Sequence, residues 1–156
     1  MAEILIREFL PGDEAAFLAL NREWIDRYFR MEAPDEAVLN DPRGAILDRG
    51  GRIFFAHRDG QAIGCCALIR IGDGEFEVAK MAVTPSAQGT GVGRLLLGAV
   101  IDSARAGGAR RLCLETNHVL VPAIRLYESM GFQHIAHDPA HPSPYVRSDV
   151  VMQLLL

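Results

Sequence analysis

The segment from residue 75 to residue 116 constrains the fold of this chain more than any other. It runs from the β-rich stretch EFEVAKMAV through a loop with three alternating glycines and a helical pattern, GRLLLGAVIDSARA, to the apolar stretch RRLCLET. Two strands of one sheet that are joined by a helix lie nearly parallel. The segment therefore predicts a parallel crossover in an α/β sheet, with the glycine loop between its first strand and its helix.

The segments on both sides of this crossover supply further strands and helices. Residues 51–71 predict a hairpin, because two β-rich runs meet at Asp59-Gly60, and Asp73-Gly74 marks a second turn. We expect one domain over residues 1–156, of the α/β class (α+β type), with a mixed, mostly antiparallel central sheet of six to seven strands and about four flanking helices. The other expected elements are a strand at 3–9, a helix at 11–29, a short helix or turn at 31–42, a helix at 122–130 and strands at 132–137 and 148–156.

Charge and cysteine content exclude several classes of protein. The formal net charge is −4, so the chain has no basic footprint for nucleic acid and little attraction to an anionic membrane surface. No apolar run reaches the ~18 residues that indicate a bilayer span, and the start MAEILIREF is typical of a first strand rather than a signal peptide. The three cysteines, two of them adjacent, are typical of buried thiols in a reducing compartment. We therefore expect a cytoplasmic protein without a nucleic-acid or membrane partner.

The loop SAQGTGVGR is typical of an anion site. The first amides of the following helix have no partner within the helix, the helix dipole makes this end positive, and glycines leave the backbone accessible. A P-loop is excluded, because Gly93 is followed by Arg94 and Leu95 rather than by a lysine and a hydroxyl. A dinucleotide fingerprint is disfavoured by a third glycine one position early, although Glu115 lies roughly where a ribose-binding acid would. A glycine turn without a ligand is a third alternative.

Four motifs together resemble those of one enzyme superfamily. The loop from Gln88 to Gly93 is preceded by MAVTP and followed by ETN and AIRLYESMGF, in this order over roughly residues 62–135. This arrangement resembles the GNAT N-acyltransferases, whose loop has the pattern Q/R-x-x-G-x-G/A. The resemblance implies a V-shaped splay between the two middle strands and acetyl-CoA as cosubstrate, with no metal.

The resemblance also implies which residues hold acetyl-CoA. The loop amides would bind the pyrophosphate, the strand before the loop would pair with the pantetheine arm, and Asn117 would contact the cosubstrate or a bridging water. The implied cosubstrate-binding residues are Met81, Ala82, Val83, Gln88, Gly89, Thr90, Gly91, Val92, Gly93, Arg94, Asn117 and Ala123. An amide near Met81 or Ala82 would stabilise the oxyanion of a tetrahedral intermediate.

Two residues are expected to move protons. Tyr127, in LYESMGF, matches the family tyrosine that points at the sulfur, and the alternative is a tyrosine that only packs in the core. Glu77 matches the position where many relatives place a glutamate that acts through water. Glu75 has the same strand parity and could replace it, and the alternative for both is a solvated strand carboxylate.

The expected activity is N-acetyl transfer to a primary amine of a small molecule, an amino acid or a peptide, and the alternative is a non-catalytic acyl-CoA sensor. The acceptor should lie between the first helices and the final hairpin, where Trp24 and Tyr28 could line it. The loop at 137–147, with Tyr145 and Arg147, could form part of a lid. His134, His137 and His141 lack the partners of a metal site. The last strand ends in apolar residues that could sit at a sheet edge, which suggests a homodimer.

Overall fold

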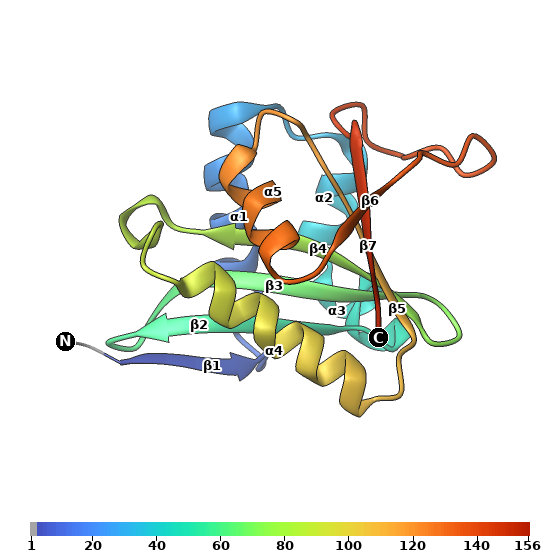
Figure 1. Ribbon diagram of the computed structural model, residues 1–156. Coiled ribbons are helices and arrows are strands. Elements are labelled where there is room, and N and C mark those ends of the chain that lie inside the picture. The colour runs from blue at the N-terminus through green and yellow to red at the C-terminus, as the bar shows by residue number, and fades with distance from the viewer. Residues whose placement is uncertain (1–2) are drawn as a thin grey trace.

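The seven strands form one mixed sheet in the order β1-β2-β3-β4-β5-β7-β6, with helices on both faces (Figure 1). The computed structural model describes residues 3–156. The strands are β1 (Ile4–Glu8), β2 (Arg52–Arg58), β3 (Gln61–Gly72), β4 (Glu75–Val83), β5 (Arg111–Thr116), β6 (Gln133–Ile135) and β7 (Val150–Leu155). The helices are α1 (Glu14–Tyr28), α2 (Ala33–Leu39), α3 (Pro42–Ala45), α4 (Val92–Ala106) and α5 (Val121–Ser129), with short 3₁₀ turns at Leu47–Arg49 and Pro85–Ala87.

β2, β3 and β4 form an antiparallel meander, as the turn signals predict, and β1, which is joined to β2 through α1, α2 and α3, also pairs with it in antiparallel. β2 and β3 pair around Asp59-Gly60, where both residues have positive φ angles of 53° and 76°. β3 and β4 pair around Asp73-Gly74, where Gly74 has a φ of 70°. α4 then carries the chain to β5, which pairs with β4 in parallel. The predicted crossover and the predicted mixed sheet are both confirmed.

β4 and β5 pair over only a short stretch before they splay apart. The parallel register joins Glu75–Glu77 to Arg111–Cys113, and the strands diverge from there (Figure 1). β4 also carries a bulge, since Cys65 pairs with Ala82 while Ala67 pairs with Ala79, so that one extra residue lies on β4. Lys80 sits in this bulge with a φ of 54°. A bulge raises the local twist and turns a strand from its neighbour, which opens the sheet at this place.

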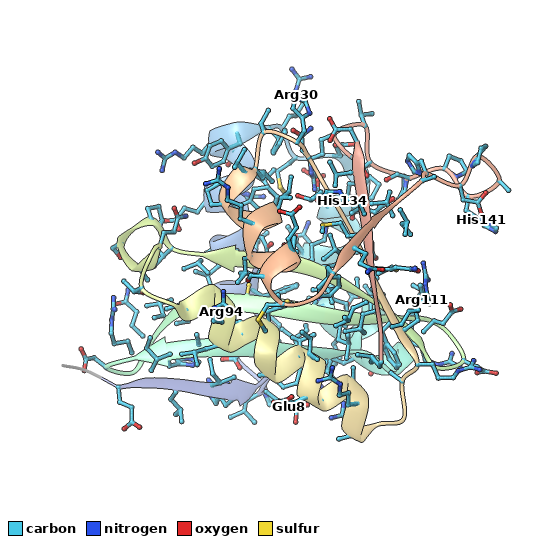
Figure 2. All side chains as sticks on the ribbon, viewed as in Figure 1. Glu8, Arg30, Arg94, Arg111, His134 and His141 are labelled. Atoms are coloured by element: carbon cyan, nitrogen blue, oxygen red, sulfur yellow. The ribbon has the colours of Figure 1, made fainter. Side chains whose placement is uncertain are left out.

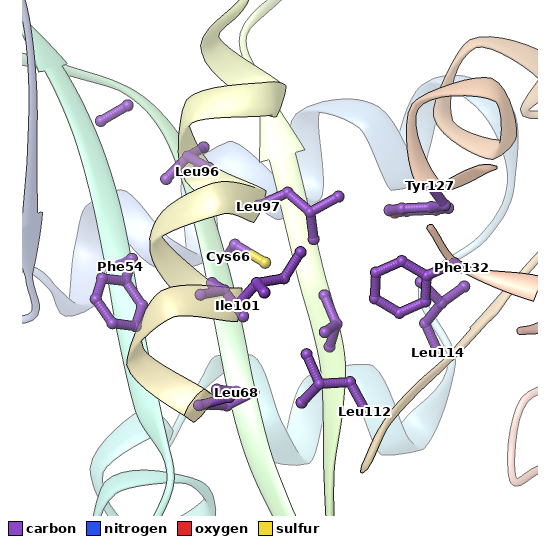
Figure 3. Close-up of a cluster of buried hydrophobic side chains, with 14 of the residues drawn as sticks. Phe54, Cys66, Leu68, Leu96, Leu97, Ile101, Leu112, Leu114, Tyr127 and Phe132 are labelled. Atoms are coloured by element: carbon purple, nitrogen blue, oxygen red, sulfur yellow. The ribbon is translucent and has the colours of Figure 1, made fainter. Parts of the chain in front are cut away.

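The helices bury the two faces of the sheet in separate cores. α4 and α5 cover one face, where Cys66 and Leu68 of β3 pack with Leu96, Leu97 and other buried side chains (Figure 3). α1, α2 and α3 cover the other face, where Cys65 and Ala67 of β3 pack. Alternate residues of β3 therefore enter opposite cores, which explains why this strand carries a continuous apolar run. None of the helices within residues 3–156 has the length and apolar character that crossing a membrane requires.

The end of the chain corrects one expectation. β7 lies between β5 and β6 and is not an edge strand, because β6 pairs with it over Val151–Gln153. The edge strands are β1 and the short β6. Val150, Leu154 and Leu155 of β7 lie outside its pairing with β6, and Leu155 is exposed. The prediction that the last strand forms a sheet edge is therefore wrong. A dimer through that strand consequently has no support from the topology.

Candidate active site

A cavity of about 310 Å³ opens where β4 and β5 diverge. Its walls come from the end of α1, from β4, β5 and α5, and from the loop before β7. Eight of the residues that the resemblance singles out line it: Glu77, Met81, Ala82, Val83, Gln88, Asn117, Ala123 and Tyr127. Trp24, Tyr28, Tyr145 and Arg147, expected on the acceptor side, line the same cavity. The structure thus brings these eight residues and the predicted acceptor residues to one place, whereas residues 89–94 do not line this cavity.

The glycine loop lies beside this cavity and leads into α4. Gly89 and Gly91 have φ angles of 76° and 89°, and Gly91 is the N-cap of the helix. A side chain at either position would meet no atom within 4 Å, so glycine is needed for the backbone conformation and not for packing. Gly93 is different, because a Cβ there would lie 3.1 Å from both Met81 Cε and Leu126 Cδ2. The first turn of α4 therefore packs closely on β4 and α5.

The remaining loop residues hold this turn in place. The Gln88 side chain donates to the Val83 carbonyl at 3.1 Å, and the Thr90 hydroxyl donates to the Ala87 carbonyl. Val92 is buried under the helix start. Arg94 projects from the first turn of α4 toward α5, where its guanidinium donates to Ser129 Oγ at 2.8 Å (Figure 2). Arg94 is exposed, and the unpaired amides at the start of α4 make this helix end positive.

Tyr127 belongs both to the core and to the cavity. Its ring packs edge-on against Phe132, with 6.0 Å between ring centroids (Figure 3), and only 8% of the residue is exposed. Its hydroxyl faces the cavity wall, 4.0 Å from Met81 Sδ. Burial raises the pKa of this phenol, so its proton is retained at neutral pH. Tyr127 therefore packs in the core and also lines the cavity, and its role in proton transfer stays a prediction.

Glu77 and Glu75 differ sharply although they share a face of β4. Glu77 lines the cavity, and burial together with the nearby Glu115 carboxylate raises its pKa from 4.5 to about 7, against a lowering by Lys80. Glu75 lies outward and pairs with Arg111 at 3.4 Å. A carboxyl group that titrates near neutral pH can accept a proton and release it again. Of the two candidates, the structure favours Glu77.

Asn117 and the loop before β7 close one side of the cavity. Asn117 Nδ2 donates to the Arg147 carbonyl at 2.8 Å, and its Oδ1 accepts from the Val119 amide at 2.9 Å. Both polar atoms of its amide therefore support the loop. The predicted contact of Asn117 with the cosubstrate stays a prediction.

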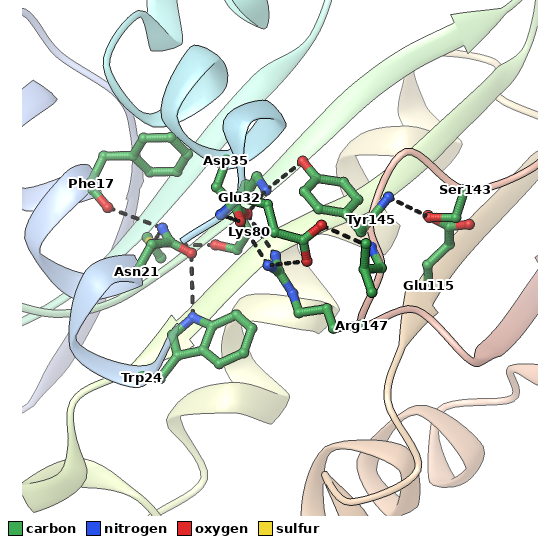
Figure 4. Close-up of polar contacts among 12 residues, drawn as sticks. Phe17, Asn21, Trp24, Glu32, Asp35, Lys80, Glu115, Ser143, Tyr145 and Arg147 are labelled. Atoms are coloured by element: carbon green, nitrogen blue, oxygen red, sulfur yellow. Dashed lines mark hydrogen bonds and ion pairs between the residues drawn. The ribbon is translucent and has the colours of Figure 1, made fainter. Parts of the chain in front are cut away.

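A buried ionic network next to the cavity was not foreseen from the sequence (Figure 4). Asp35, at the start of α2, has no exposed surface. Its carboxylate accepts two hydrogen bonds of 2.6 Å from Arg147 and one of 2.9 Å from Lys80 Nζ. These contacts lower the pKa of Asp35 to about 2 against the opposing effect of burial. Glu32 also pairs with Arg147, at 3.3 Å, and Tyr145 accepts from Lys80 at 2.8 Å.

The network joins three segments that are far apart in the chain. Asp35 and Lys80 are 45 positions apart, and Asp35 and Arg147 are 112 apart. Asp35 is also part of a capping box, since its side chain accepts from the Glu32 amide at 2.9 Å. The only sequence signal was this helix-start pattern, which does not reveal distant partners.

Of the three histidines His134, His137 and His141, the first and the last form ion pairs with carboxylates. His134 pairs with Glu128 at 3.1 Å and His141 with Asp138 at 2.9 Å, both on the surface (Figure 2). Within residues 3–156, no group of three potential metal-ligating side chains is present.

Comparisons with known proteins agree with this geometry. Residues 18–132 match the model of the acetyltransferase (GNAT) family. An IAA acetyltransferase from Azospirillum brasilense is 40% identical over 111 residues, which are 70% of this chain and 72% of the relative. A mycothiol acetyltransferase from Thermomonospora curvata is 36% identical over 149 residues, which are 90% of this chain but only 48% of the relative.

Solved structures share the fold. A GNAT acetyltransferase from Staphylococcus aureus superposes with a TM-score of 0.88 at 18% identity, covering 97% of this chain and 98% of the other. A Salmonella typhimurium protein that was solved with its cofactor acetyl-CoA superposes with a TM-score of 0.74 at 24% identity, covering 98% and 94%. At these identities, the likeness establishes the architecture.

Proposed function

This chain belongs to the acetyltransferase (GNAT) family, and we propose that it transfers an acetyl group from acetyl-CoA to a primary amine. The acceptor is a small molecule, an amino acid or a peptide. One observation carries the proposal: the cavity between the diverging strands has Glu77 and Tyr127 in its walls, next to the start of α4. A proton acceptor, a proton donor and an anion-binding helix end thus meet at one opening.

The residues at the splay fit acetyl-CoA. The start of α4, a helix of 15 residues, offers unpaired amides in an open glycine loop, and Arg94 lies in its first turn. Such a helix end attracts a pyrophosphate. Beyond Glu77, the edge of β4 that faces the gap has left the register with β5, so Met81, Ala82 and Val83 can pair with an extended amide chain.

The proton chemistry follows from the two titratable groups. An amine arrives as an ammonium ion, and Glu77 takes up a proton from it, directly or through water. The free amine attacks the thioester carbonyl, and an amide near Met81 or Ala82 stabilises the oxyanion. When the carbon–sulfur bond breaks, the Tyr127 hydroxyl donates its proton to the leaving sulfur, and the second proton that the acylated nitrogen loses restores the phenol. Burial keeps this phenol protonated for that purpose.

Calorimetric titration with acetyl-CoA, with NAD and ATP as controls, tests the binding step. We expect micromolar binding of acetyl-CoA alone and release of CoA when a mixed panel of primary amines is added. Binding without release for every amine would favour an acyl-CoA sensor, and no binding would refute the proposal.

Two glutamate variants on α4 sharpen this test. Gly91→Glu puts bulk and negative charge at the helix N-cap and should abolish binding. Gly98→Glu puts the same charge on the same helix at a position where a Cβ meets no atom within 4 Å, and it should leave binding unchanged. Equal binding by both variants would show that the loop does not hold the phosphates.

A further inference from the structure

The acceptor half of the cavity is the part near Trp24, Tyr28, Tyr145 and Arg147. Its charges and rings indicate which kind of amine can bind there. Four charged residues line the cavity: Glu77, Lys80, Glu115 and Arg147. Whether the pocket attracts or repels a carboxylate on the acceptor depends on which of these charges are already neutralised. The partners of each residue answer that question.

The two cations are already paired. Lys80 Nζ lies 2.9 Å from Asp35 Oδ1, and Arg147 uses both terminal nitrogens on the same carboxylate at 2.6 Å, with Glu32 at 3.3 Å (Figure 4). The side chain of Lys80 is 6% exposed and that of Arg147 is 15% exposed. A substrate carboxylate would therefore have to compete with a buried carboxylate that already satisfies both cations.

The two carboxylates have no such partner. Within residues 3–156, neither Glu77 nor Glu115 forms an ion pair, and Glu115 accepts one hydrogen bond, from Ser143 Oγ at 2.9 Å. The two lie close enough that the Glu115 charge hinders ionisation of Glu77. Counted with their neighbours, two cations face four carboxylates: Glu32, Asp35, Glu77 and Glu115. This half of the cavity therefore favours a cation.

The outer wall of the same half is aromatic. Trp24 and Phe29, at the end of α1, pack edge-on with 6.2 Å between ring centroids, and both line the cavity. Tyr28 also lines it and is half-exposed, so its ring extends the apolar wall toward solvent. Arg147 lies 5.9 Å from the Trp24 ring centroid, so its guanidinium also makes a cation–π contact with this wall.

We propose that the acceptor is a primary amine without a carboxylate on the carbon next to nitrogen, carried on an aromatic or similarly flat apolar group. The ammonium faces Glu77 and Glu115, and the apolar group lies against Trp24 and Phe29. This inference rests on the proposed function and narrows its acceptor class, since it separates aromatic amino acids from the corresponding simple amines.

Matched acceptors separate charge from shape. We would measure kcat/KM with saturating acetyl-CoA for phenethylamine, phenylalanine and phenylalanine methyl ester. Phenethylamine should exceed phenylalanine by on the order of 100-fold, as expected for like charges about 6 Å apart at an effective dielectric of about 20. The methyl ester keeps the bulk but not the charge and should recover most of this difference. Equal use of phenylalanine, or an ester as poor as the acid, would overturn the inference.

A variant ties the preference to its residues. Glu115→Gln removes one unpaired carboxylate and should reduce the preference for phenethylamine over phenylalanine by about tenfold. Hexylamine, which lacks the ring, should have a lower kcat/KM than phenethylamine. Trp24→Leu should reduce this difference between the two amines. An unchanged preference in Glu115→Gln would count against the charge argument.

The outcomes for the two proposals differ. If acetyl-CoA does not bind, the proposed function itself fails. If acetyl-CoA binds and other amines, such as benzylamine, spermidine or a peptide N-terminus, are acetylated while phenethylamine is not preferred over phenylalanine, only the acceptor inference fails.

Discussion

Replacing Glu77 by glutamine should make the protein more stable at high pH while it removes activity. The folded protein raises the pKa of Glu77 from 4.5 to about 7, so folding favours the protonated form. Stability is therefore unaffected below about pH 4.5 and falls as the pH rises toward 7. At 1.36 kcal/mol per pKa unit, the rise from 4.5 to about 7 costs at most about 3.4 kcal/mol above pH 7, and solvent screening at the cavity wall reduces this to roughly 1–3 kcal/mol. Glutamine has the shape without the charge and does not incur this cost.

Two assays test this reasoning together. Urea unfolding at pH 4 should give the same free energy for Glu77→Gln and the parent, whereas at pH 8 the variant should be more stable by roughly 1–3 kcal/mol. The parent's kcat/KM should rise through about pH 7 as Glu77 loses its proton. The variant should lose this rise and about 10²–10⁴-fold in rate.

Glu75→Gln is the matched control. It lies two positions earlier on the same strand, and its side chain is 44% exposed in its pair with Arg111. We expect a change of less than about 1 kcal/mol and no change in the pH profile. A Glu77→Gln variant that is less stable than the parent at pH 8, or one with the parent's pH profile, would refute the assignment of Glu77 as the titrating base.

Three further variants test other parts of the site. Tyr127→Phe should lower turnover by about 10²-fold and leave acetyl-CoA affinity unchanged, and an unaltered rate would leave Tyr127 with a packing role only. Arg94→Ala should weaken acetyl-CoA binding by about tenfold and reduce its salt dependence in calorimetry, without changing the melting temperature, because Arg94 is exposed. Asp35→Asn should destabilise the protein by roughly 3–5 kcal/mol in urea, since two cations lose their buried partner, whereas Asp73→Asn removes a surface pair and should change little.

Local signals account for the part of the fold that the sequence predicts. The strand at residues 75–83 and the turns at Asp59-Gly60 and Asp73-Gly74 are found where the patterns place them. The helix expected at 11–29 begins only at Glu14, because Pro11-Gly12 remains in a turn. The position of the last strand depends on which neighbour it pairs with. No local pattern encodes that choice, and this is why β7 was wrongly expected at an edge.

The bulge in β4 shows the limit of such patterns at the site. Lys80 adopts a φ of 54°, a conformation that lysine rarely takes and that its neighbours in sequence do not announce. Alternation also places Glu75 and Glu77 on one face and cannot separate them. What separates them is their surroundings, because Glu75 pairs with Arg111 whereas Glu77 is buried in the cavity wall near Glu115.

The charge of the acceptor half is the property that most needs the structure. Lys80 and Arg147 are the two cations that line the cavity. Asp35 lies 45 and 112 positions from them and pairs with both, and Glu32 also pairs with Arg147, so neither cation is left free for a substrate carboxylate. Within residues 3–156, the carboxyl groups of the cavity without a cationic partner are those of Glu77 and Glu115, and no local pattern reveals this difference, because the partners lie far apart in the chain.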